Sequence, residues 1–470
     1  MRAGAGLVLA AAGWLSALGA SAEFVPPPTF EITNLLRTLD LSKAYVRQST
    51  SMNVMNVGSF PTDEFYIAFP GDVVNSTVDH VAILEAKTKT SDGALLAHSK
   101  AEFDSERNVQ YYKITLDAPV KPRKSVSLQF ASAVTDTLQA QPRTIKQADP
   151  QYLQYEGSTV ELSPYFVAKQ RTIVKYGNRY LASYTRPSEA DPVTESGTLT
   201  YGPYENTPAF KVEPLAVRYD YTMPVIKGDR LERDVWVSHY GGNVAVEERY
   251  WIHNAGARMT EAFSRLKWQA TGFSKAPTAA LRGFGMVLKP GVRDVYFTDE
   301  VGNVSTSRFR PGLRESSLEL MPRYPIFGGW NYSFTVGWNI DAGRLLKTAG
   351  DDEYVLRVPF IEGPENVVYD EVVFSAVLPE GAEVIELAAP VNFDSTETTV
   401  LKSHLDTKGR TVVRLTAHNV IDEDRRRDVY ILYKVPASAQ LQKPAIVAAA
   451  LGLVFAAVMF VQRVDTSISK

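Results

Sequence analysis

The chain has 470 residues, and its 50 basic and 53 acidic residues are dispersed along it to give a formal net charge of −3. This balance excludes the basic surface that nucleic acid or an anionic membrane surface would require. The lack of cysteine excludes disulfides, thiolate metal sites and cysteine nucleophiles.

The N-terminus carries the pattern of a signal peptide. An apolar run from Leu7 to Leu18 is followed by Ala20, Ser21 and Ala22, a small-x-small pattern that signal peptidase accepts. The run is shorter than a membrane span, which argues against an uncleaved anchor. We therefore expect residues 1–22 to be removed by cleavage after Ala22 and the mature chain to enter the secretory pathway.

Strand signals dominate the mature chain, because its many aromatic, valine and threonine residues suit pleated, half-buried strands. Apolar and polar residues alternate from Tyr112 to Leu116 and again from Val126 to Phe130, which predicts a β-hairpin or meander. The segment from Gln141 to Gly157 is polar and contains Pro142 and Pro150, so we expect a long surface connection there.

A faint internal repeat predicts two related domains. Each copy begins an alternating apolar strand and ends in an Asn-x-Gly turn, as two homologous β-sandwich domains would. The copies, offset by 196 to 198 residues, are Arg37, Leu39, Leu41, Ser42, Asn56 and Gly58, and Arg233, Val235, Val237, Ser238, Asn254 and Gly256. We expect a first domain at 23–222 and a second at 223–440.

Three further elements are predicted in the second half. A short helix is expected from Thr260 to Trp268, with Thr260 as its N-cap. From Trp330 to Trp338, aromatic and apolar residues alternate with polar or small ones, which predicts a half-buried strand. The alternating charge blocks from Asp422 to Asp428 are typical of a solvated loop.

Near the C-terminus, 17 residues from Ala445 to Val461 carry no charge, about the minimum that crosses a bilayer. A buried soluble helix is disfavoured because only nine residues follow Val461, and the basic residues after the run argue against a GPI signal. We predict a transmembrane helix at 444–461 and a tail at 462–470. With a cleaved signal peptide, the tail is expected to be cytosolic.

Within this span Ala448, Gly452 and Ala456 recur every four residues on one helix face. Small residues in such a stripe allow another membrane helix to approach closely, which predicts a packing face for a membrane partner. The alternative is accidental spacing in an alanine-rich helix, since six of the 17 residues are alanine.

The usual catalytic motifs are missing from the sequence. It contains no nucleophile elbow, zinc-binding H-E-x-x-H helix, P-loop or dinucleotide fingerprint. No two histidines have the spacing of metal ligands on one helix face; they are His80, His98, His239, His253, His404 and His418. We therefore predict no catalytic residue, metal or cofactor.

Three N-glycosylation sequons suit a lumenal chain, and their acceptors are Asn75, Asn303 and Asn331. Asn331 falls on the polar face of the strand predicted from 330 to 338. A glycan on Asn331 is therefore expected to point away from the aromatic face.

Four segments carry a resemblance to a known family: PRYPIFGGWNYSFTVGW from Pro322, DVYFTDEVGNVSTS from Asp294, RDVWVSHYGGNVAVEERY from Arg233 and YDEVVFSAVLPEGAEV from Tyr369. They resemble ribophorin I, the first subunit of the eukaryotic oligosaccharyltransferase, and the similarity extends over essentially the whole mature chain. The most specific piece is the motif from Phe327 to Trp330. Read from its residues alone, this motif is a glycine turn whose aromatic side chains pack inward; the alternative is a contact patch for a partner or glycan.

The resemblance implies a single-pass type I protein of the endoplasmic reticulum membrane. Its complex transfers a preassembled oligosaccharide from dolichyl diphosphate to Asn in Asn-x-Ser/Thr of nascent proteins. In that family the chemistry belongs to a separate multi-spanning subunit, so the resemblance implies a non-catalytic role in complex stability and in presenting polypeptide substrates. The expected partners are the other subunits, including the catalytic one, and nascent polypeptide. The short tail looks like the fungal form.

Together these patterns predict a mainly β protein with two tandem β-sandwich-like lumenal domains followed by a single C-terminal transmembrane helix. Two other functions stay open from the residues alone. One is a lumenal cargo receptor, and the other is a hydrolase whose site is assembled from distant strands.

Overall fold

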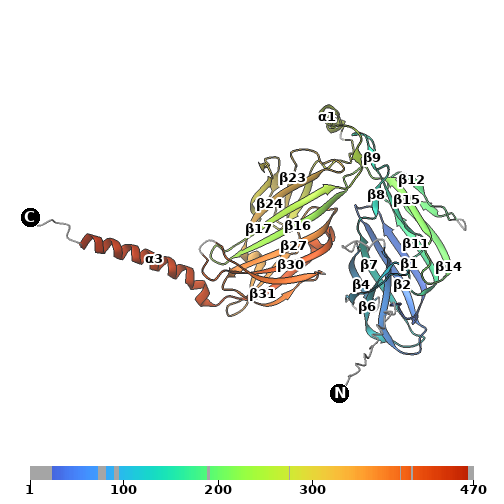
Figure 1. The fold of residues 1–470 in the computed structure, drawn as a ribbon, viewed down its shortest axis with the longest axis horizontal. Helices are drawn as coiled ribbons and strands as arrows, with labels where there is room; N and C mark the ends of the chain where they lie inside the picture. The colour runs from blue at the N-terminus through green and yellow to red at the C-terminus, as the bar shows by residue number, and fades with distance from the viewer. Residues whose placement is uncertain are drawn as a thin grey trace, which may run out of the picture.

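The computed structural model describes residues 24–71, 81–88, 95–187, 191–274, 276–391, 393–403 and 406–463. The chain folds mainly into β-strands, which form two bodies of packed sheets, and one long helix projects from the second body (Figure 1). The predicted fold class is confirmed. The predicted cleavage after Ala22 lies outside the described residues.

In the first half, the large sheet has the strand order β13-β14-β11-β1-β2-β7-β4, and the smaller sheets have the orders β12-β15-β10-β8 and β3-β6-β5. The strands of this half are β1 Phe30–Asp40, β2 Val46–Asn56, β3 Thr62–Pro70, β4 Val81–Thr88, β5 Ala97–Asp104, β6 Val109–Val120, β7 Ser125–Val134, β8 Leu138–Ala140, β9 Thr144–Ile145, β10 Tyr152–Ser158, β11 Phe166–Lys175, β12 Leu181–Tyr184, β13 Val193–Glu195, β14 Thr198–Thr207 and β15 Pro214–Asp220.

In the second half, the large sheet has the order β21-β20-β24-β17-β16-β27-β30-β29, and the smaller sheets have the orders β25-β26-β31-β28 and β19-β23-β22. Its elements are β16 Ile226–Ser238, β17 Asn243–Asn254, β18 Arg258–Met259, α1 Arg265–Ser274, β19 Phe284–Leu288, β20 Arg293–Asp299, β21 Gly302–Asn303, β22 Arg308–Arg310, β23 Ser316–Leu320, β24 Asn331–Asp341, α2 Ala342–Leu345, β25 Leu346–Gly350, β26 Glu353–Pro359, β27 Val367–Glu380, β28 Glu383–Ala388, β29 Ser395–Leu401, β30 Arg410–Ile421, η2 Asp422–Arg426, β31 Asp428–Lys434 and α3 Ala437–Arg463.

The two halves repeat one topology. Read from the opposite edge, the large sheet of the second half is β29-β30-β27-β16-β17-β24-β20, which matches the first half strand for strand and adds β21 at its end. The three-stranded sheets β3-β6-β5 and β19-β23-β22 correspond in the same way, as do the four-stranded sheets. In each large sheet the opening strand pairs antiparallel with the next strand and parallel with a later one.

The sequence repeat falls on equivalent places of this topology. Arg37 lies in β1 and Arg233 in the corresponding strand β16, and both are buried. Asn56 and Asn254 end the following strands; each is fully buried, donates two side-chain hydrogen bonds to carbonyl groups and accepts one from the glycine amide two residues later. The predicted repeat is therefore confirmed by the strand order.

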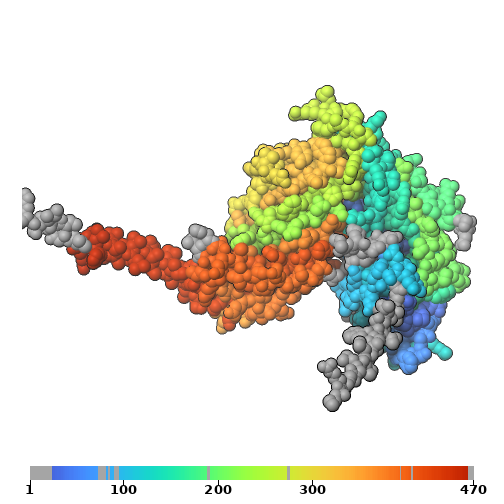
Figure 2. Space-filling view, in the orientation of Figure 1, coloured from blue at the N-terminus to red at the C-terminus, as the bar shows by residue number. Residues whose placement is uncertain are grey.

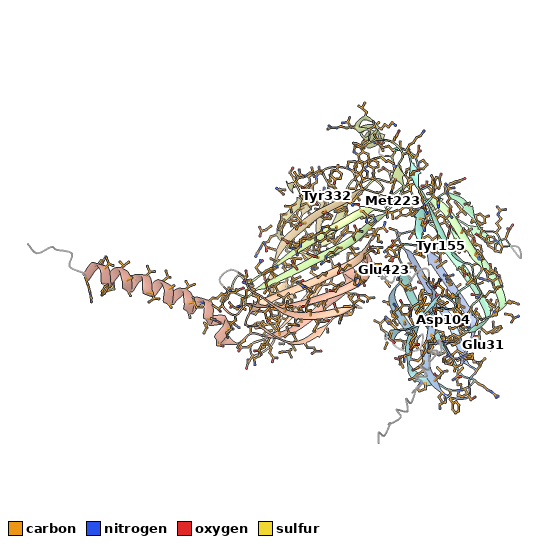
Figure 3. All side chains as sticks on the ribbon, viewed as in Figure 1. Glu31, Asp104, Tyr155, Met223, Tyr332 and Glu423 are labelled. Carbon is orange, nitrogen blue, oxygen red and sulfur yellow. The ribbon has the colours of Figure 1, made fainter. Side chains whose placement is uncertain are left out.

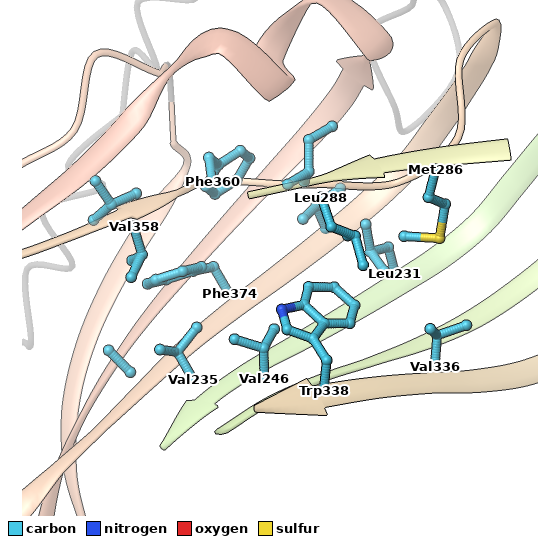
Figure 4. Close-up of a cluster of buried hydrophobic side chains, with 14 of the residues drawn as sticks. Leu231, Val235, Val246, Met286, Leu288, Val336, Trp338, Val358, Phe360 and Phe374 are labelled. Carbon is cyan, nitrogen blue, oxygen red and sulfur yellow. The ribbon is translucent and has the colours of Figure 1, made fainter. Parts of the chain in front are cut away.

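Each half has its own hydrophobic core. The first cluster of buried side chains extends from Phe30 to Val225 and adds Ala257 and Ala279, and the second extends from Ile226 to Val435. Figure 4 shows part of the second core, where Trp338 and Phe374 lie among aliphatic side chains of several strands. Burial of this much apolar surface is what lets domains without disulfides fold.

One small apolar contact between the two halves is made where Tyr45 and Ala133 of the first pack with Val368 and Ile421 of the second. The hydroxyl of Tyr45 donates a 2.6 Å hydrogen bond to Asp422. Asp422 and Asp424 are only 5% exposed. The predicted solvated loop at 422–428 is thus wrong at its acidic end: Asp422 meets partners from the other half of the chain, and Asp424 pairs with Arg427 at 3.2 Å.

The polar segment from Gln141 to Gly157 is not a free surface connection. It contains β9, which pairs in parallel with β18, and most of β10, which lies in a four-stranded sheet. Gln151 is fully buried, and its side chain receives a hydrogen bond from the Ala257 amide and donates to the Tyr221 carbonyl. The segment therefore links the first half of the chain to the second.

The hairpin predicted for Tyr112–Leu116 and Val126–Phe130 is wrong. Both segments are strands, but β6 pairs with β3 and β5, whereas β7 pairs with β2 and β4 in a different sheet. The alternation correctly indicated which side chains are buried. It carries no information on which strand lies alongside.

The short helix begins five residues later than predicted, at Arg265. Thr260 does not cap it, because its amide and hydroxyl both donate to the Ile145 carbonyl. Ser264 takes the capping position, and its hydroxyl oxygen accepts a hydrogen bond from the Lys267 amide.

Candidate functional site: the sequon region and the membrane anchor

Two of the three predicted glycan acceptors lie in one region of the second half. Asn303 ends the edge strand β21, Asn331 begins β24, and both side chains are exposed. Asn75 lies outside the described residues. The predicted strand is confirmed, since Tyr332 and Phe334 are buried while Asn331 is on the opposite face.

Arg323 connects the two acceptor regions. Its Nη2 donates to the carbonyl oxygens of Gly302 and Asn303 at 3.1 and 2.9 Å, and its Nε lies 2.5 Å from the Asp299 carboxylate. Burial alone would raise the pKa of Asp299, but the hydrogen bonds from Arg323 and the Val301 amide hold that pKa below its usual value. The carboxylate is therefore a fixed anion at neutral pH.

An open pocket of about 230 Å³ adjoins Asn331. It is lined by Asp299, Glu300, Val301, Arg323, Tyr324, Asn331, Tyr332 and Ser333. Figure 3 labels Tyr332 on the upper part of the second body. The pocket thus combines the side chains of Tyr324 and Tyr332 with the Arg323–Asp299 ion pair and the exposed carboxylate of Glu300 at its rim.

The Phe327–Trp330 motif packs inward, as its residues predicted. Phe327 is 4% exposed, and its ring meets those of Trp268 and Trp330 edge to face. Gly328 is required because a Cβ there would come within 2.0 Å of the Ala257 carbonyl oxygen. The motif therefore fixes the loop that leads into β24 and positions Asn331.

A buried acid pair lies in the second core but has no access to a substrate. Arg233 contacts Glu248 and Glu362, at 2.7 Å for the latter, and the three side chains are 9% exposed or less. Tyr250 also donates to Glu248, and burial, opposed by Arg233, raises the pKa of that carboxyl. Arg37 forms the equivalent centre in the first half, with Glu161 and Gln48.

A groove of about 490 Å³ crosses the outer face of the large sheet in the second half. Ion pairs line its floor. Arg230 pairs with Glu232 and Glu371. Arg249 pairs with Glu232 and Asp234. Val373, Val377 and Val412 are among the apolar residues between these pairs. The groove is polar, and the charges of its arginines and carboxylates nearly cancel.

The histidines are dispersed. Nδ1 of His253 lies 2.9 Å from Asp229 and Nδ1 of His418 lies 2.8 Å from Asp394, while His239 contacts the Tyr433 hydroxyl. His80 and His404 lie outside the described residues. Over the described ranges, no three His, Asp or Glu side chains form a group that could hold a metal ion.

The C-terminal helix α3 is long and apolar enough to cross a membrane. It has 27 residues, and no described side chain of it is buried; Figure 2 shows its outer part projecting away from the two bodies. The helix begins at Ala437, so the expectation that Pro444 starts it is wrong. Pro444 lies inside it, after about two turns that contact the second body.

The first turns of α3 are clamped to that body. Lys443 reaches Asp406 at 2.5 Å and Glu380 at 3.3 Å, and the Gln442 amide donates to the Thr407 hydroxyl at 2.6 Å. Tyr240 donates to the carbonyl of Gln440. Two residues separate the end of β31 at Lys434 from the helix, so no long linker lies between sheet and anchor.

Beyond the clamp, Ala448, Gly452 and Ala456 are exposed on the helix. A Cβ added at Gly452 would meet nothing within 4 Å. The predicted packing face is thus unoccupied by any described part of this chain.

The family model and the curated relatives agree with each other. The chain matches the family model described as Ribophorin I over residues 30–462. It is 31% identical over 441 residues to the Arabidopsis thaliana dolichyl-diphosphooligosaccharide–protein glycosyltransferase subunit 1B. The matched region covers 93% of this chain and 94% of that relative. It is 31% identical to subunit 1 of Schizosaccharomyces pombe, covering 90% and 93%, and 29% identical to subunit 1 of Caenorhabditis elegans, covering 94% and 73%.

Among solved structures, the chain is similar to an M1 zinc metallopeptidase of Deinococcus radiodurans, with 11% identity, a TM-score of 0.24 and coverage of 46% of this chain and 49% of the other. It is also similar to yeast LTA4 hydrolase, with 10% identity, a TM-score of 0.28 and coverage of 42% and 31%. Likeness at this level supports no argument on fold or function.

Proposed function

The chain belongs to the ribophorin I family, and on this premise we propose that it is a subunit of an oligosaccharyltransferase complex that acts in protein N-glycosylation. The observation that carries the proposal is the family match from residue 30 to residue 462. Relatives named as subunit 1 of the dolichyl-diphosphooligosaccharide–protein glycosyltransferase match over most of both chains. The complex transfers a preassembled oligosaccharide from dolichyl diphosphate to Asn in Asn-x-Ser/Thr.

We infer that this subunit supplies no catalytic group and acts in complex stability and substrate presentation. The Glu248–Glu362 pair supports this inference, because both carboxylates are saturated by Arg233 in the core and would be useless for acid–base chemistry on a glycan. The alternative of a hydrolase built from distant strands predicts turnover by the purified chain alone, with release of sugar from a glycoside substrate.

We place the chain in the endoplasmic reticulum membrane with residues 23 to about 443 in the lumen. The apolar helix α3 supports a single span, and the exposure of Asn303 and Asn331 suits acceptors on the lumenal side. The expected partners are other subunits of the complex, held in the membrane through the face of Ala448, Gly452 and Ala456.

Nascent polypeptide is a further proposed partner, and the groove on the large sheet is the surface that suits it. Extended peptide is polar along its backbone and varied in its side chains, which matches a floor of paired charges and valines. A photoreactive residue at Thr399, which lines the groove, should cross-link to nascent glycoproteins, whereas one at exposed Tyr180 should not.

Affinity purification in mild detergent tests the main proposal. We expect the full chain to recover other oligosaccharyltransferase subunits, and its depletion to cause loss of glycosylation on many cargo proteins. Recovery of none of these subunits, together with residence in post-Golgi membranes, would contradict the proposal and favour the cargo receptor.

A further inference from the structure

The pocket beside Asn331 has an unusual relation to its acceptor, because Asn331 is itself part of the wall. The other sequon acceptor, Asn303, is not among the lining residues, although Arg323 contacts its backbone. A group covalently attached to Asn331 would therefore start inside the pocket, at high effective concentration and with little left to lose in association entropy.

The aromatic wall of the pocket is held in a fixed orientation. The Tyr324 ring meets the Tyr332 ring at 5.6 Å and the Trp330 ring at 6.1 Å, both close to edge to face. Tyr324 nevertheless remains 43% exposed. A rigid, half-exposed ring offers an electron-rich face to weakly positive C–H groups, such as those on the apolar face of a pyranose.

The polar rim complements that wall. Glu300 is exposed at the rim and can accept hydrogen bonds from sugar hydroxyls. In the described part of the chain, Arg323 donates through Nε and Nη2, which leaves Nη1 to reach an acetamido carbonyl. Donor, acceptor and ring thus converge on one open volume of about 230 Å³.

We propose that this pocket is an intramolecular carbohydrate site, which seats the first N-acetylhexosamine of a glycan attached to Asn331. Tyr324 stacks on the sugar, and Arg323 and Glu300 hydrogen-bond to its polar groups. The seated sugar covers the end of the aromatic cluster that would otherwise face water. This inference rests on the proposed lumenal placement of the chain.

The test uses the full chain purified from its native membrane with glycans attached. Native protein is treated with a peptide N-glycosidase, and release at each acceptor is followed by mass spectrometry. In Tyr324→Ala we expect release at Asn331 to become about five- to tenfold faster than in the unmodified chain, the factor that loss of one aromatic contact gives. Release at Asn303 should not change, and Tyr180→Ala, at a tyrosine that is 67% exposed, should change neither.

Because Tyr324→Ala also removes ring contacts within the protein, a second measurement isolates the sugar. Melting temperatures are compared for Tyr324→Ala, Asn331→Gln and the double variant. A seated glycan makes the two changes non-additive: Tyr324→Ala should lower the melting temperature less in the Asn331→Gln background. Additive shifts, together with unchanged release rates, would overturn the inference.

An unglycosylated Asn331 would also overturn the inference. That outcome is distinguishable from failure of the proposed function. A glycan at Asn303, with recovery of the other subunits, would leave the proposed function standing while the pocket loses its occupant.

Discussion

The buried arginine centres illustrate how a single residue can hold distant segments together. Arg233 in β16 joins Glu248 of β17 to Glu362, which lies between β26 and β27, and so it ties two strands of the large sheet to the connection that enters a third. All three charged side chains are nearly inaccessible to water. Such a cluster is costly to leave incomplete, since the remaining carboxylates would be buried without a partner.

We therefore expect Arg233→Met to destabilise the second domain by about 3–5 kcal/mol, because it leaves two buried carboxylates without their cation. The measurement is the urea midpoint of the full chain in detergent. The control is Arg230→Met, whose pairs are at the surface with an arginine side chain 43% exposed, and which should cost below about 1 kcal/mol. Equal losses in the two variants would contradict this account.

Glu380 gives a pH-dependent prediction at the base of the anchor. Burial would raise its pKa, but hydrogen bonds from the Lys408 amide and from Thr407 lower that pKa from 4.5 to about 2. A lowered pKa in the folded state means that the stabilisation is complete above pH 4.5 and is lost as the pH falls toward 2.

The stability difference between the unmodified chain and Glu380→Gln should thus be constant above pH 4.5, shrink below it and vanish near pH 2. Melting temperatures across this range measure it. Glu383→Gln, at an exposed carboxylate in β28, is the matched control. A difference that grows as the pH falls would show that the sign is wrong.

At the scale of residues, the sequence predicted which side chains are buried but not which distant residues they contact. The alternation from Trp330 to Trp338 identified the inward face of β24, and the glycines of the Phe327–Trp330 motif indicated a tight turn. Nothing in the sequence indicated that Arg233 would meet Glu362, because they are separated by 129 residues. Contacts of that kind depend on strand order, which periodicity does not encode.

At the scale of elements, the failures have the same cause. β6 and β7 have the alternation and spacing of a hairpin, yet the chain crosses between sheets at Lys121–Lys124. Thr260 has the chemistry of an N-cap, yet the Ile145 carbonyl takes both of its donors. In each case a tertiary partner from far along the chain overrides a local preference.

The exposed stripe on α3 gives a prediction for the helix as a whole. Gly452→Leu should weaken recovery of the other subunits, because a large side chain prevents close approach of a second helix. Ala450→Leu places a leucine on the opposite face of the helix, about 160° from Gly452, and should leave recovery unchanged. Quantitative mass spectrometry of the purified complex compares them. Equal recovery from both variants would show that the stripe is accidental.

At the scale of the whole molecule, the two halves are alike in topology and are joined both around Asp422 and through the segment from Gln141 to Gly157. Asp422 accepts hydrogen bonds from Tyr45 at 2.6 Å, Lys43 at 3.0 Å and the Asn366 amide at 2.9 Å. The two clusters of buried side chains change over between Val225 and Ile226, close to the proposed division between residues 222 and 223, and the first cluster also includes Ala257 and Ala279. This arrangement predicts that the Asp422 centre is one of the contacts through which the unfolding of the two domains is coupled.

Asp422→Asn should therefore separate the melting of the two halves, because it removes the charge that Lys43 and Tyr45 share. Calorimetry of the full chain is expected to show two transitions in place of one broader transition. Glu423→Gln, at the next residue, removes only half-exposed ion pairs and should preserve the coupling. A single unchanged transition in Asp422→Asn would contradict the prediction.

The fold class and the repeat were predictable because they rest on local alternation and on residue identity at a fixed offset. The linking role of Gln141–Gly157 was not, because polar residues and prolines look the same in a free loop and in a bridge. Its strand β9 has only two residues, and β9 is recognisable as a strand only through its parallel pairing with β18.

The ion pairs of Lys443 with Asp406 and Glu380 join α3 to the second domain, so that the two should move as one rigid unit. Because only Val435 and Pro436 lie between β31 and α3, a change in the tilt of a membrane-spanning α3 would also move the second domain, and the first domain would move farther. In the proposed placement, packing against neighbouring helices, which sets helix tilt, would in this way adjust how far the first domain lies from the membrane. Helices that pack against α3 would therefore determine the orientation of two domains that are much larger than the helices themselves.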